Sequence, residues 1–553
     1  MIKVEMKPVS AMEKCFLDEA LATKQEKNAF SMFQNERLAF QVAFRGQEDA
    51  PTPKRPTLCD LKLGGALAPY ATVSLVENVP NRFPTFHISP GGAFLRTEPG
   101  LYPDLIRPLM YPNSVIVVHA QTNAMWVEVT LPEDFAAGVY DLSVALCLAG
   151  ETLAETQVSV QVIDAKLPPQ TLIHTEWFYA DCIANYYNVK PFSGAHWRYM
   201  EKYIRTATRN GINMILVPVF TPELDTYVGG ERLTTQLVEI TLADGKYSFD
   251  FTKLHRFIKM CLAAGVQYFE IPHFFTQWGA KAAPKIEVKV NGRRRKYFGW
   301  HTDAMGEEYA EFLAQFIPAL LGVLRENGVD KRCFFHVSDE PRPKQLAQYK
   351  RCKELIEPYL EGYPIIDALS DIDFYAEGVL AHPVPSTHTA MAFVEAGVPD
   401  LWVYYCGGGT GGASNRSISM PTWRTRMLGV QLYLYNIKGF LHWGYNFYNS
   451  WQSYQPLDPY GYPENGYFSP AGDSFLVYPG RDGEAWESLR LYAMRAAMDD
   501  VRALKLYESR FGREATEALI CEGLAEKPTF VSYPADPMYL SNLRERITAA
   551  FAE

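Results

Sequence analysis

The chain changes its rhythm at Leu167-Pro168-Pro169, and this change most constrains the folds open to it. Before it, short β-like runs are separated by turn residues, at 38–44, 114–120, 124–131, 140–149 and 156–164. Such regular spacing with alternating apolar residues is typical of an antiparallel β-sandwich. Two consecutive prolines stiffen the backbone and remove two hydrogen-bond donors, which suits a domain boundary. We therefore expect an N-terminal β-sandwich domain over residues 1–168.

After the break, β-rich runs alternate with amphipathic helical runs such as 196–211 and 306–328. The β-rich runs lie at 172–180, 212–220, 266–274, 333–340, 363–370, 378–384, 401–406 and 439–445. Eight repeats of this kind predict a (β/α)8 TIM-type barrel over residues 169–510. A doubly wound sheet is the main alternative, but no Gly-rich turn follows the first run. Helical patterns continue to the end of the chain, so residues 511–553 are expected to form a C-terminal helical extension.

Net charge and hydropathy limit the classes of partner that this chain is expected to bind. A formal net charge of −10 disfavours nucleic acid and anionic membrane surfaces. No stretch approaches the ~18 uncharged apolar residues of a membrane span, and the N-terminus lacks the apolar segment of a signal peptide. We expect a cytoplasmic protein without a membrane partner; a homo-oligomer is compatible with this composition. The nine cysteines form no CxxC pair, so neither a disulfide framework nor a zinc ribbon is predicted, and no cofactor is expected.

Two adjacent acids end the fourth β-rich run of the predicted barrel, in His336-Val337-Ser338-Asp339-Glu340-Pro341. In such barrels the chemistry lies at the carboxyl ends of the strands. Pro341 stops the strand, so side-chain alternation relaxes at Asp339 and Glu340 and both can face one pocket. Taken alone, the pair also fits two solvated acids that cap the next helix.

Adjacency favours a particular chemistry. Ordinary retaining glycosidases hold two carboxylates ~5–5.5 Å apart on opposite sides of the scissile bond. Neighbouring carboxylates fit better where the substrate supplies its own nucleophile, the oxygen of a 2-acetamido group. One carboxylate then orients the acetamido N–H, and the other protonates the leaving oxygen. A nearby charge and an apolar wall would raise the pKa of the acid, as this role requires.

Further segments, spread in order along residues 34–510, share one resemblance. They are Asn35-Glu36-Arg37 with Phe40-Gln41, Tyr102-Pro103-Asp104, Asn123 with Trp126 to Val129, Gly138-Val139-Tyr140, His336 to Pro341, Trp402 to Cys406, Gly439 to Gly444, 472–480, Ser488-Leu489-Arg490 and Asp499-Asp500. Together they resemble glycoside hydrolase family 123 and its relatives that carry the domain of unknown function 4091. One departure is visible, because Tyr492 stands where the family pattern has Glu.

The resemblance implies an exo-acting β-N-acetylgalactosaminidase that retains anomeric configuration through acetamido participation. It implies a carbohydrate substrate with a terminal N-acetylhexosamine, with Asp339 as the acetamido-orienting residue and Glu340 as the acid/base. Two alternatives remain: a carbohydrate-binding or degenerate barrel without turnover, and a conventional two-carboxylate glycosidase. In the latter, the nucleophile candidates are Glu176, Glu270 and Asp367.

Aromatic and polar residues at the other strand ends are candidates for substrate binding. They are His336, Trp177, His273, Tyr405, Trp443 and Asn446. Trp443 is the best candidate for a sugar-stacking wall, and Tyr405 for a hydroxyl that donates to the acetamido oxygen. Strand alternation prevents Tyr404 and Tyr405 from both facing inward, and it leaves open which of them does.

Three other features carry weaker signals. Histidines in the predicted strands suggest a metal-dependent hydrolase as another class of enzyme. However, the first strand has His174-Thr-Glu176 in place of His-x-His, and the sequence contains no HExxH motif. We therefore expect no metal. Residues 407–412 contain a literal GxGxxG, but it follows the seventh strand and is interpreted as an active-site loop. Residues 285–300 are predicted to form a β-hairpin.

Overall fold

The computed structural model describes residues 2–47, 56–85, 94–222, 224–407 and 412–552. The chain divides into two compact units. The first comprises residues 1–170, 416–434 and 486–553, and the second comprises 171–415 and 435–485. The domain boundaries at 168 and 510 stay predictions.

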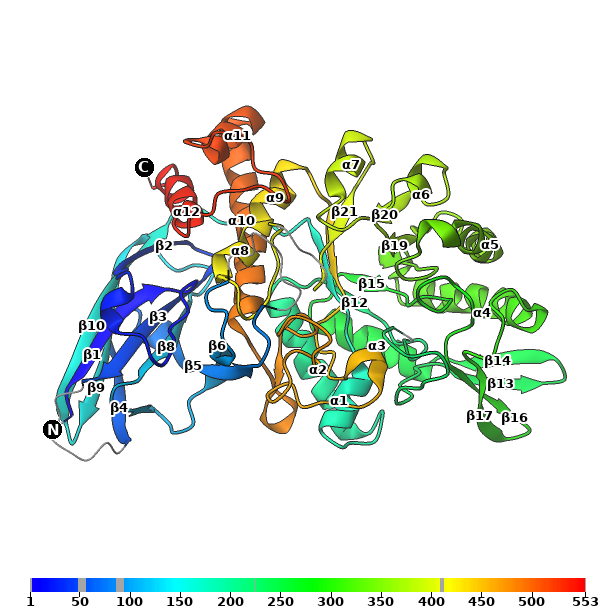
Figure 1. The fold of residues 1–553 in the computed structure, drawn as a ribbon, viewed down its shortest axis with the longest axis horizontal. Helices are drawn as coiled ribbons and strands as arrows, with labels where there is room; N and C mark the ends of the chain where they lie inside the picture. Colours follow the sequence, from blue (N-terminus) through cyan, green and yellow to red (C-terminus); the bar gives the residue numbers. More distant parts are fainter. Residues whose placement is uncertain (1, 48–55, 86–93, 223, 408–411, 553) are drawn as a thin grey trace. The chain divides into compact units, whose positions relative to one another are not determined.

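The first unit contains two five-stranded sheets (Figure 1). One sheet has the order β1-β3-β8-β5-β6 and is antiparallel; the other has the order β2-β10-β9-β4-β7 and is antiparallel except where β2 lies parallel to β10. The strands are β1 (Val4–Ser10), β2 (Ala29–Phe33), β3 (Arg37–Gly46), β4 (Thr57–Gly64), β5 (Ala71–Asn81), β6 (Gly100–Pro108), β7 (Ser114–Val117), β8 (Thr122–Thr130), β9 (Gly138–Leu148) and β10 (Glu151–Ile163). The expected N-terminal antiparallel sheets are thus confirmed.

Both sheets contribute to one hydrophobic core. Phe40, Val42 and Val127 come from the first sheet, and Leu142 and Val160 from the second, and each is completely buried. These side chains recur at alternate positions along their strands, as a sheet with one buried face requires.

Helices from the C-terminal part of the chain complete the first unit. They are α8 (Thr422–Arg426), α9 (Leu428–Leu434), α10 (Leu489–Phe511), α11 (Arg513–Cys521) and α12 (Tyr539–Ala549). The Ser488 hydroxyl caps α10 by accepting from the backbone N–H of Leu491, and Gly512, at φ 86°, ends this helix in a conformation that favours glycine. The helical character predicted for the end of the chain is observed.

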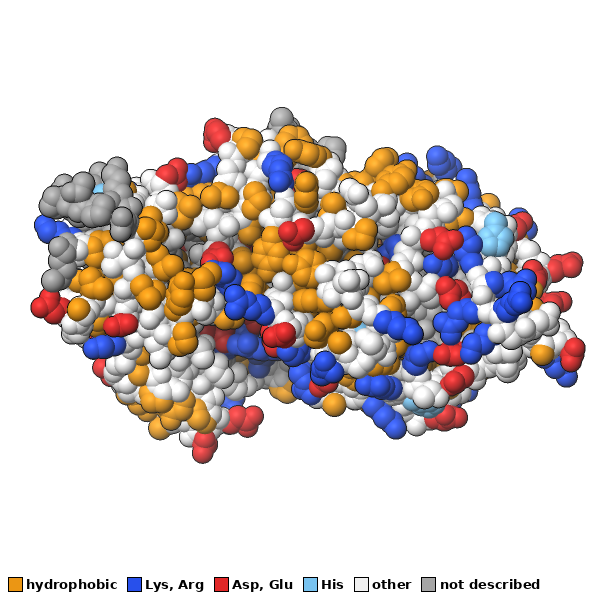
Figure 2. Space-filling model, turned by 90° about the horizontal axis from the view of Figure 1, so that it is seen from below, with side chains coloured by type: hydrophobic (Ala, Val, Ile, Leu, Met, Phe, Trp, Pro, Cys, Tyr) orange, Lys and Arg blue, Asp and Glu red, His pale blue; other side chains and the backbone are white. Residues whose placement is uncertain are grey.

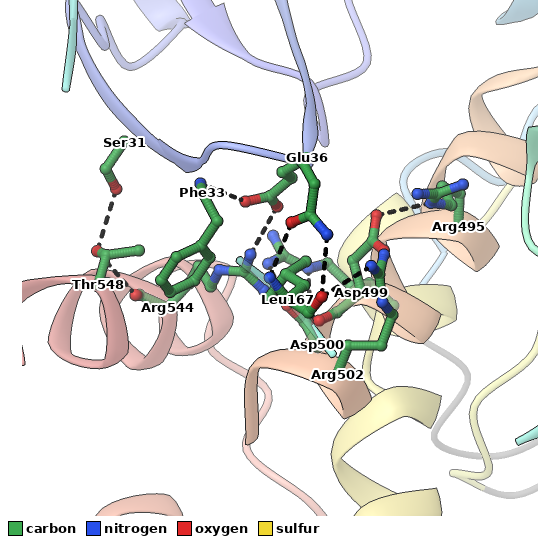
Figure 3. Close-up of polar contacts among 12 residues, drawn as sticks. Ser31, Phe33, Glu36, Leu167, Arg495, Asp499, Asp500, Arg502, Arg544 and Thr548 are labelled. Carbon is green, nitrogen blue, oxygen red and sulfur yellow. Dashed lines mark hydrogen bonds and ion pairs between the residues drawn. The ribbon is translucent and has the colours of Figure 1, made fainter. Parts of the chain in front are cut away.

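Ion pairs fasten these helices to the sheets and to one another (Figure 3). Arg544 of α12 donates to Glu36, 2.6 Å away, at the turn before β3, and it also lies 3.3 Å from Asp500 of α10. Asp499 is held by Arg495 and Arg502, both at 2.7 Å. The segments around Glu36 and Asp499-Asp500, which the sequence singles out separately, therefore meet in one network.

A second buried pair joins two other distant segments of the first unit. The guanidinium of Arg490 binds the Asp104 carboxylate through Nε at 3.0 Å and Nη2 at 2.8 Å, and both side chains are at most 1% exposed. Tyr492 does not pair with a charge in the way the family's Glu suggests. Its ring packs edge-on against Trp126, with centroids 4.7 Å apart.

The second unit is built on short parallel strands. They are β11 (Ile173–Glu176), β12 (Met214–Leu216), β15 (Tyr268–Glu270), β18 (Cys333–Phe334), β19 (Ile366–Ala368), β20 (His382–Val384), β21 (Trp402–Tyr404) and β22 (Gly439–His442). Six form a curled parallel half-barrel in the order β18-β15-β12-β11-β22-β21, and β19 pairs with β20. Single parallel bridges, Phe335–Ile365 and Ser386–Tyr404, lie beyond β18 and β20.

Helices follow most of these strands, as predicted. They are α1 (Ala180–Tyr186), α2 (Gly194–Arg209), α3 (Thr252–Ala263), α4 (Glu307–Glu326), α5 (Leu346–Ile356), α6 (Asp373–Ala376) and α7 (Ala390–Glu395). In α2, the residues Trp197, Met200, Tyr203 and Ile204 are buried, a three-to-four-residue spacing that places one helix face in the core. The curled parallel half-barrel confirms part of the predicted architecture, and its closure into a full (β/α)8 barrel stays a prediction.

Loop insertions form a further sheet in the second unit. Strands β13 (Glu239–Ala243), β14 (Lys246–Asp250), β16 (Ile286–Val290) and β17 (Arg293–Phe298) pair in the order β14-β13-β16-β17. The predicted hairpin at 285–300 is confirmed as β16 and β17. Two short strands, β23 (Tyr478–Pro479) and β24 (Ala485–Trp486), follow β22 in the chain.

The surface of the described residues is mixed in charge. Acidic and basic side chains are interspersed among hydrophobic ones on the face drawn in Figure 2. None of the described helices is both long and apolar enough to cross a membrane.

Candidate active site

The acidic pair Asp339-Glu340 follows β18, where the chain leaves the parallel sheet. Glu340 has φ 42°, in the left-handed region that non-glycine residues rarely adopt. The backbone is held on both sides there, because Trp278 N–H donates to the Asp339 carbonyl at 2.9 Å and Glu340 N–H donates to the Ala368 carbonyl at 3.1 Å. β18 itself ends at Phe334, earlier than the predicted run 333–340, and the left-handed turn at Glu340 lies in the loop that follows.

The two carboxyl groups interact with each other. Both side chains are partly exposed, and the pKa of Asp339 lies well above its usual value. Burial is the main cause, the negative charge of Glu340 the next, and Asp367 and Asp225 add to it. Glu340 has a partner of its own, because the Tyr404 hydroxyl donates to Glu340 Oε1 at 2.7 Å.

Below this pair lies a fully buried ion triad. His336 donates from Nε2 to Glu270 at 2.6 Å and from Nδ1 to Asp367 at 2.9 Å, and all three side chains are completely buried. Burial lowers the pKa of His336, but the two carboxylates outweigh it and raise the value to about 10. His336 is therefore an imidazolium at neutral pH, with both ring nitrogens turned to carboxylates.

Trp177 and His273 pack around this triad. The indole N–H of Trp177 donates to Glu270 at 2.8 Å, and its ring meets His273 edge-on with centroids 5.5 Å apart. The ring of His273 is tilted by 33° to that of His336, at 4.3 Å between centroids. Burial and the His336 charge hold the pKa of His273 well below its usual value, so this ring is neutral.

His273, His336 and Asp367 place one ligand atom each within 4.8 Å of one another, a spacing that a metal ion would accept. In the described structure both ring nitrogens of His336 face carboxylates, and His273 Nε2 lies 3.5 Å from Asp367 Oδ1. The imidazolium of His336 is thus shared between two buried carboxylates.

Trp443 and Asn446 follow β22. Trp443 is partly exposed, and its indole N–H donates to Asp473 at 3.0 Å. Asn446 is buried and uses its amide on the backbone of Tyr179, accepting from N at 2.9 Å and donating to O at 3.0 Å. Trp443 thus keeps a surface open to a ligand, whereas Asn446 holds the loop after β11.

The neighbouring tyrosines of β21 differ in their contacts. Tyr404 reaches Glu340, as described above, whereas Tyr405 is completely buried and packs against Phe440 and His442, with centroids at 5.0 and 5.4 Å. A role of Tyr405 in substrate binding stays a prediction. Most of the 407–412 loop lies outside the described residues.

Two residues near the pair were missed by the sequence analysis. Trp278, 38% exposed, lies directly beside the Asp339 backbone. Asp225, on the loop after β12, is buried and contributes to the raised pKa of Asp339. Neither lies at the end of a predicted strand, which is the signal that indicated the other candidates.

Comparisons with known proteins bear on the family and the fold. A family model described as glycoside hydrolase 123, catalytic domain, matches residues 177–507, more than half of the chain. Among solved structures, a family 123 glycoside hydrolase from Clostridium perfringens, described in terms of glycolipid glycan hydrolysis, aligns with a TM-score of 0.73 at 14% identity, covering 99% of this chain and 98% of that one.

More distant similarities are weak. A family 39 glycoside hydrolase from the gut symbiont Bacteroides cellulosilyticus WH2 aligns with a TM-score of 0.34 at 11% identity, over 80% of this chain and 82% of that one. That likeness is too low to bear on the fold. None of the curated proteins compared matches the chain.

Proposed function

Because the chain belongs to glycoside hydrolase family 123, we propose that it is an exo-acting β-N-acetylgalactosaminidase that uses the 2-acetamido oxygen of its substrate as nucleophile. The substrate is a carbohydrate with a terminal N-acetylhexosamine. The cytoplasmic location and a homo-oligomeric state stay predictions.

One observation carries this proposal: two neighbouring carboxyl groups, Asp339 and Glu340, interact at a left-handed turn and remain partly exposed. The acetamido group and the glycosidic oxygen are substituents of adjacent carbons of one ring, so neighbouring side chains can reach both. In this assignment Asp339 orients the acetamido N–H and stabilises the oxazolinium ion. Glu340, held by Tyr404, protonates the leaving oxygen and then activates water.

The protonation of the pair fits these roles. In the empty site, burial and the charge of Glu340 favour the protonated form of Asp339. An acetamido N–H that donates to Asp339 favours its ionised form instead. Substrate binding therefore frees a proton beside Glu340, where the leaving oxygen needs it.

The other carboxylates near the strand ends are poorly placed to attack a sugar. Glu176, Glu270 and Asp367 are completely buried, and each lies within 3.1 Å of a histidine nitrogen. A nucleophile must reach the anomeric carbon, so these contacts favour acetamido participation over a conventional two-carboxylate mechanism.

The arrangement of strands supports a closed barrel as well. We infer that the bridges Phe335–Ile365 and Ser386–Tyr404 continue the parallel pairing from β18 to β19 and from β20 to β21. The eight strands then close into a (β/α)8 barrel with Asp339, Glu340, Tyr404 and Trp443 at one end, where Trp443 stacks on the sugar.

A substrate panel tests the mechanism. We expect turnover of aryl N-acetyl-β-galactosaminides, competitive inhibition by the thiazoline analogue of the oxazolinium ion, and no detectable turnover of the matching β-galactosides, which lack the acetamido nucleophile. Equal turnover of both glycosides, measured by release of the aryl group, would refute participation. Sugar binding by calorimetry without hydrolysis of any member would instead identify a binding protein.

Tyr404→Phe and Tyr405→Phe form a matched pair of variants, because each loses one hydroxyl at adjacent positions of β21. We expect Tyr404→Phe to lower kcat/KM about 10- to 100-fold, since it removes a hydrogen bond to a charged carboxylate. Steady-state kinetics on an unactivated substrate measure both. A larger loss in Tyr405→Phe would show that Tyr405 is the functional hydroxyl, as the sequence analysis expected.

A further inference from the structure

One buried carboxylate outside the acidic pair is poorly supplied with hydrogen-bond donors. Asp225 lies on the loop after β12 and is 8% exposed. Among the described residues, no group makes a hydrogen bond of good geometry with either of its carboxylate oxygens. Buried carboxylates are normally satisfied by donors, so this one is suited to a ligand that brings its own.

The loop that carries Asp225 is held rigidly. Asp225 N–H donates to the Gln277 side chain at 2.5 Å, and the Ser453 hydroxyl donates to the Asp225 carbonyl at 2.8 Å. Asp225, Gln452 and Ser453 all have left-handed backbones, with φ of 49°, 49° and 54°. Strain of this kind concentrates at functional sites, where surrounding contacts hold it in place.

The same contacts bring Asp225 towards the acidic pair. Gln277, which holds Asp225, is followed by Trp278, whose backbone N–H donates to the Asp339 carbonyl. The charge of Asp225 is also one of the causes of the raised pKa of Asp339. Asp225 therefore lies close enough to Asp339 to influence its protonation.

The charged groups around Asp225 do not satisfy it. Arg232, on the same segment, is engaged by Asp181 of α1, at 2.6 Å for Nη2 and 2.9 Å for Nε. Asp339 faces Asp225 from beyond β18, and the Tyr179 hydroxyl donates to the Trp443 carbonyl. Burial raises the pKa of Asp225 to about 7, against the opposing influence of Arg232 and the Gln452 backbone N–H.

We propose that Asp225 is a specificity-determining residue that accepts hydrogen bonds from one or two ring hydroxyls of the terminal sugar. The inference rests on the proposed function, because it assigns Asp225 to the sugar that Asp339 and Glu340 act on. Sugar hydroxyls supply donors to a carboxylate that the protein leaves without them. A site built to bind a hydroxyl rejects an analogue that lacks it, so Asp225 selects among hexosamines.

The test combines substitution of Asp225 with ligands that each lack one hydroxyl group. Binding of N-acetylgalactosamine and of its 3-, 4- and 6-deoxy analogues is measured by calorimetry for the wild type and Asp225→Ala. We expect at least one deoxy analogue to bind the wild type about 10- to 100-fold more weakly than N-acetylgalactosamine does. In Asp225→Ala, the affinities of these two ligands should differ by less than about threefold. Asp225→Asn keeps the shape of the side chain and serves as a second variant in case Asp225→Ala misfolds. Glu231→Gln, at an exposed carboxylate on the same segment, is the matched control.

Proton release gives a second readout. Because the pKa of free Asp225 is about 7 and hydroxyl donors favour its ionised form, binding at pH 7 should release up to roughly half a proton from this group. Calorimetry in buffers of different ionisation enthalpy should show less release for Asp225→Asn than for the wild type. Affinity should accordingly rise with pH through neutrality in the wild type more steeply than in the variant.

The outcomes separate the two proposals. Equal losses for every deoxy analogue in the wild type and Asp225→Ala would overturn the role of Asp225 and leave the proposed hydrolase intact. A wild type that neither binds N-acetylgalactosamine nor cleaves its glycosides would overturn both.

Discussion

Glu340→Gln is expected to slow the hydrolysis of an N-acetylgalactosaminide with a poor leaving group by about 10²–10⁴-fold, the range typical of a general acid. Glutamine keeps the size of the side chain and the contact with Tyr404, but it has no proton to give to the leaving oxygen. An aryl leaving group of low pKa departs without protonation, so the dinitrophenyl glycoside should lose far less in its first step. Single-turnover kinetics with both substrates measure this difference.

Asp339→Asn is the matched control for that experiment. It removes the negative charge that the oxazolinium ion requires, so it should slow both substrates to a similar degree. Equal losses in Glu340→Gln for good and poor leaving groups would contradict the role of Glu340 as acid. A difference confined to Asp339→Asn would exchange the roles of the two residues.

Arg490→Leu is expected to destabilise the protein by about 3–5 kcal/mol, because it leaves the buried Asp104 carboxylate without its partner. Lys14, whose pKa is lowered to about 8 by burial, lies in the field of both charges and is too weak a substitute. Urea denaturation followed by fluorescence measures the loss.

The double variant Arg490→Leu/Asp104→Leu should recover much of that loss, since replacing both partners of a buried pair by apolar groups is often nearly neutral. Lys527→Gln, which breaks an exposed pair with Glu517 in the same unit, should change stability by less than about 1 kcal/mol. A loss for Arg490→Leu no larger than for Lys527→Gln would show that the buried pair contributes little.

Local patterns predicted much of the fold. Alternation revealed β3, β8, β9 and β10, whose inner faces are fully apolar. It did not reveal β5, because most of its side chains are only half-buried and need not be apolar. Helical periodicity in α10 indicated an apolar face but not what that face contacts, so the grouping of the C-terminal helices with the N-terminal sheets could not be foreseen.

The candidate site, like the fold, could be predicted from local sequence patterns only in part. Pro341 led us to expect a strand that runs to Glu340, whereas β18 ends at Phe334 and the two acids lie in the loop beyond it. A role of His336 in substrate binding stays a prediction, and its engagement by Glu270 and Asp367 depends on which strands are neighbours and on their register. Asp225 carries no local signal, because its burial results from loops that are far apart in sequence.

The first unit is assembled from segments that lie far apart in the chain, and this has a consequence for its synthesis on the ribosome. Its sheets are synthesised before the second unit, whereas most of the helices grouped with them follow that unit, and Arg490 lies 386 residues after Asp104. The second unit, by contrast, has its own residues available earlier. A nascent chain therefore carries incompletely covered β-strands until these helices emerge, the period in which aggregation competes with folding and in which chaperones are most needed.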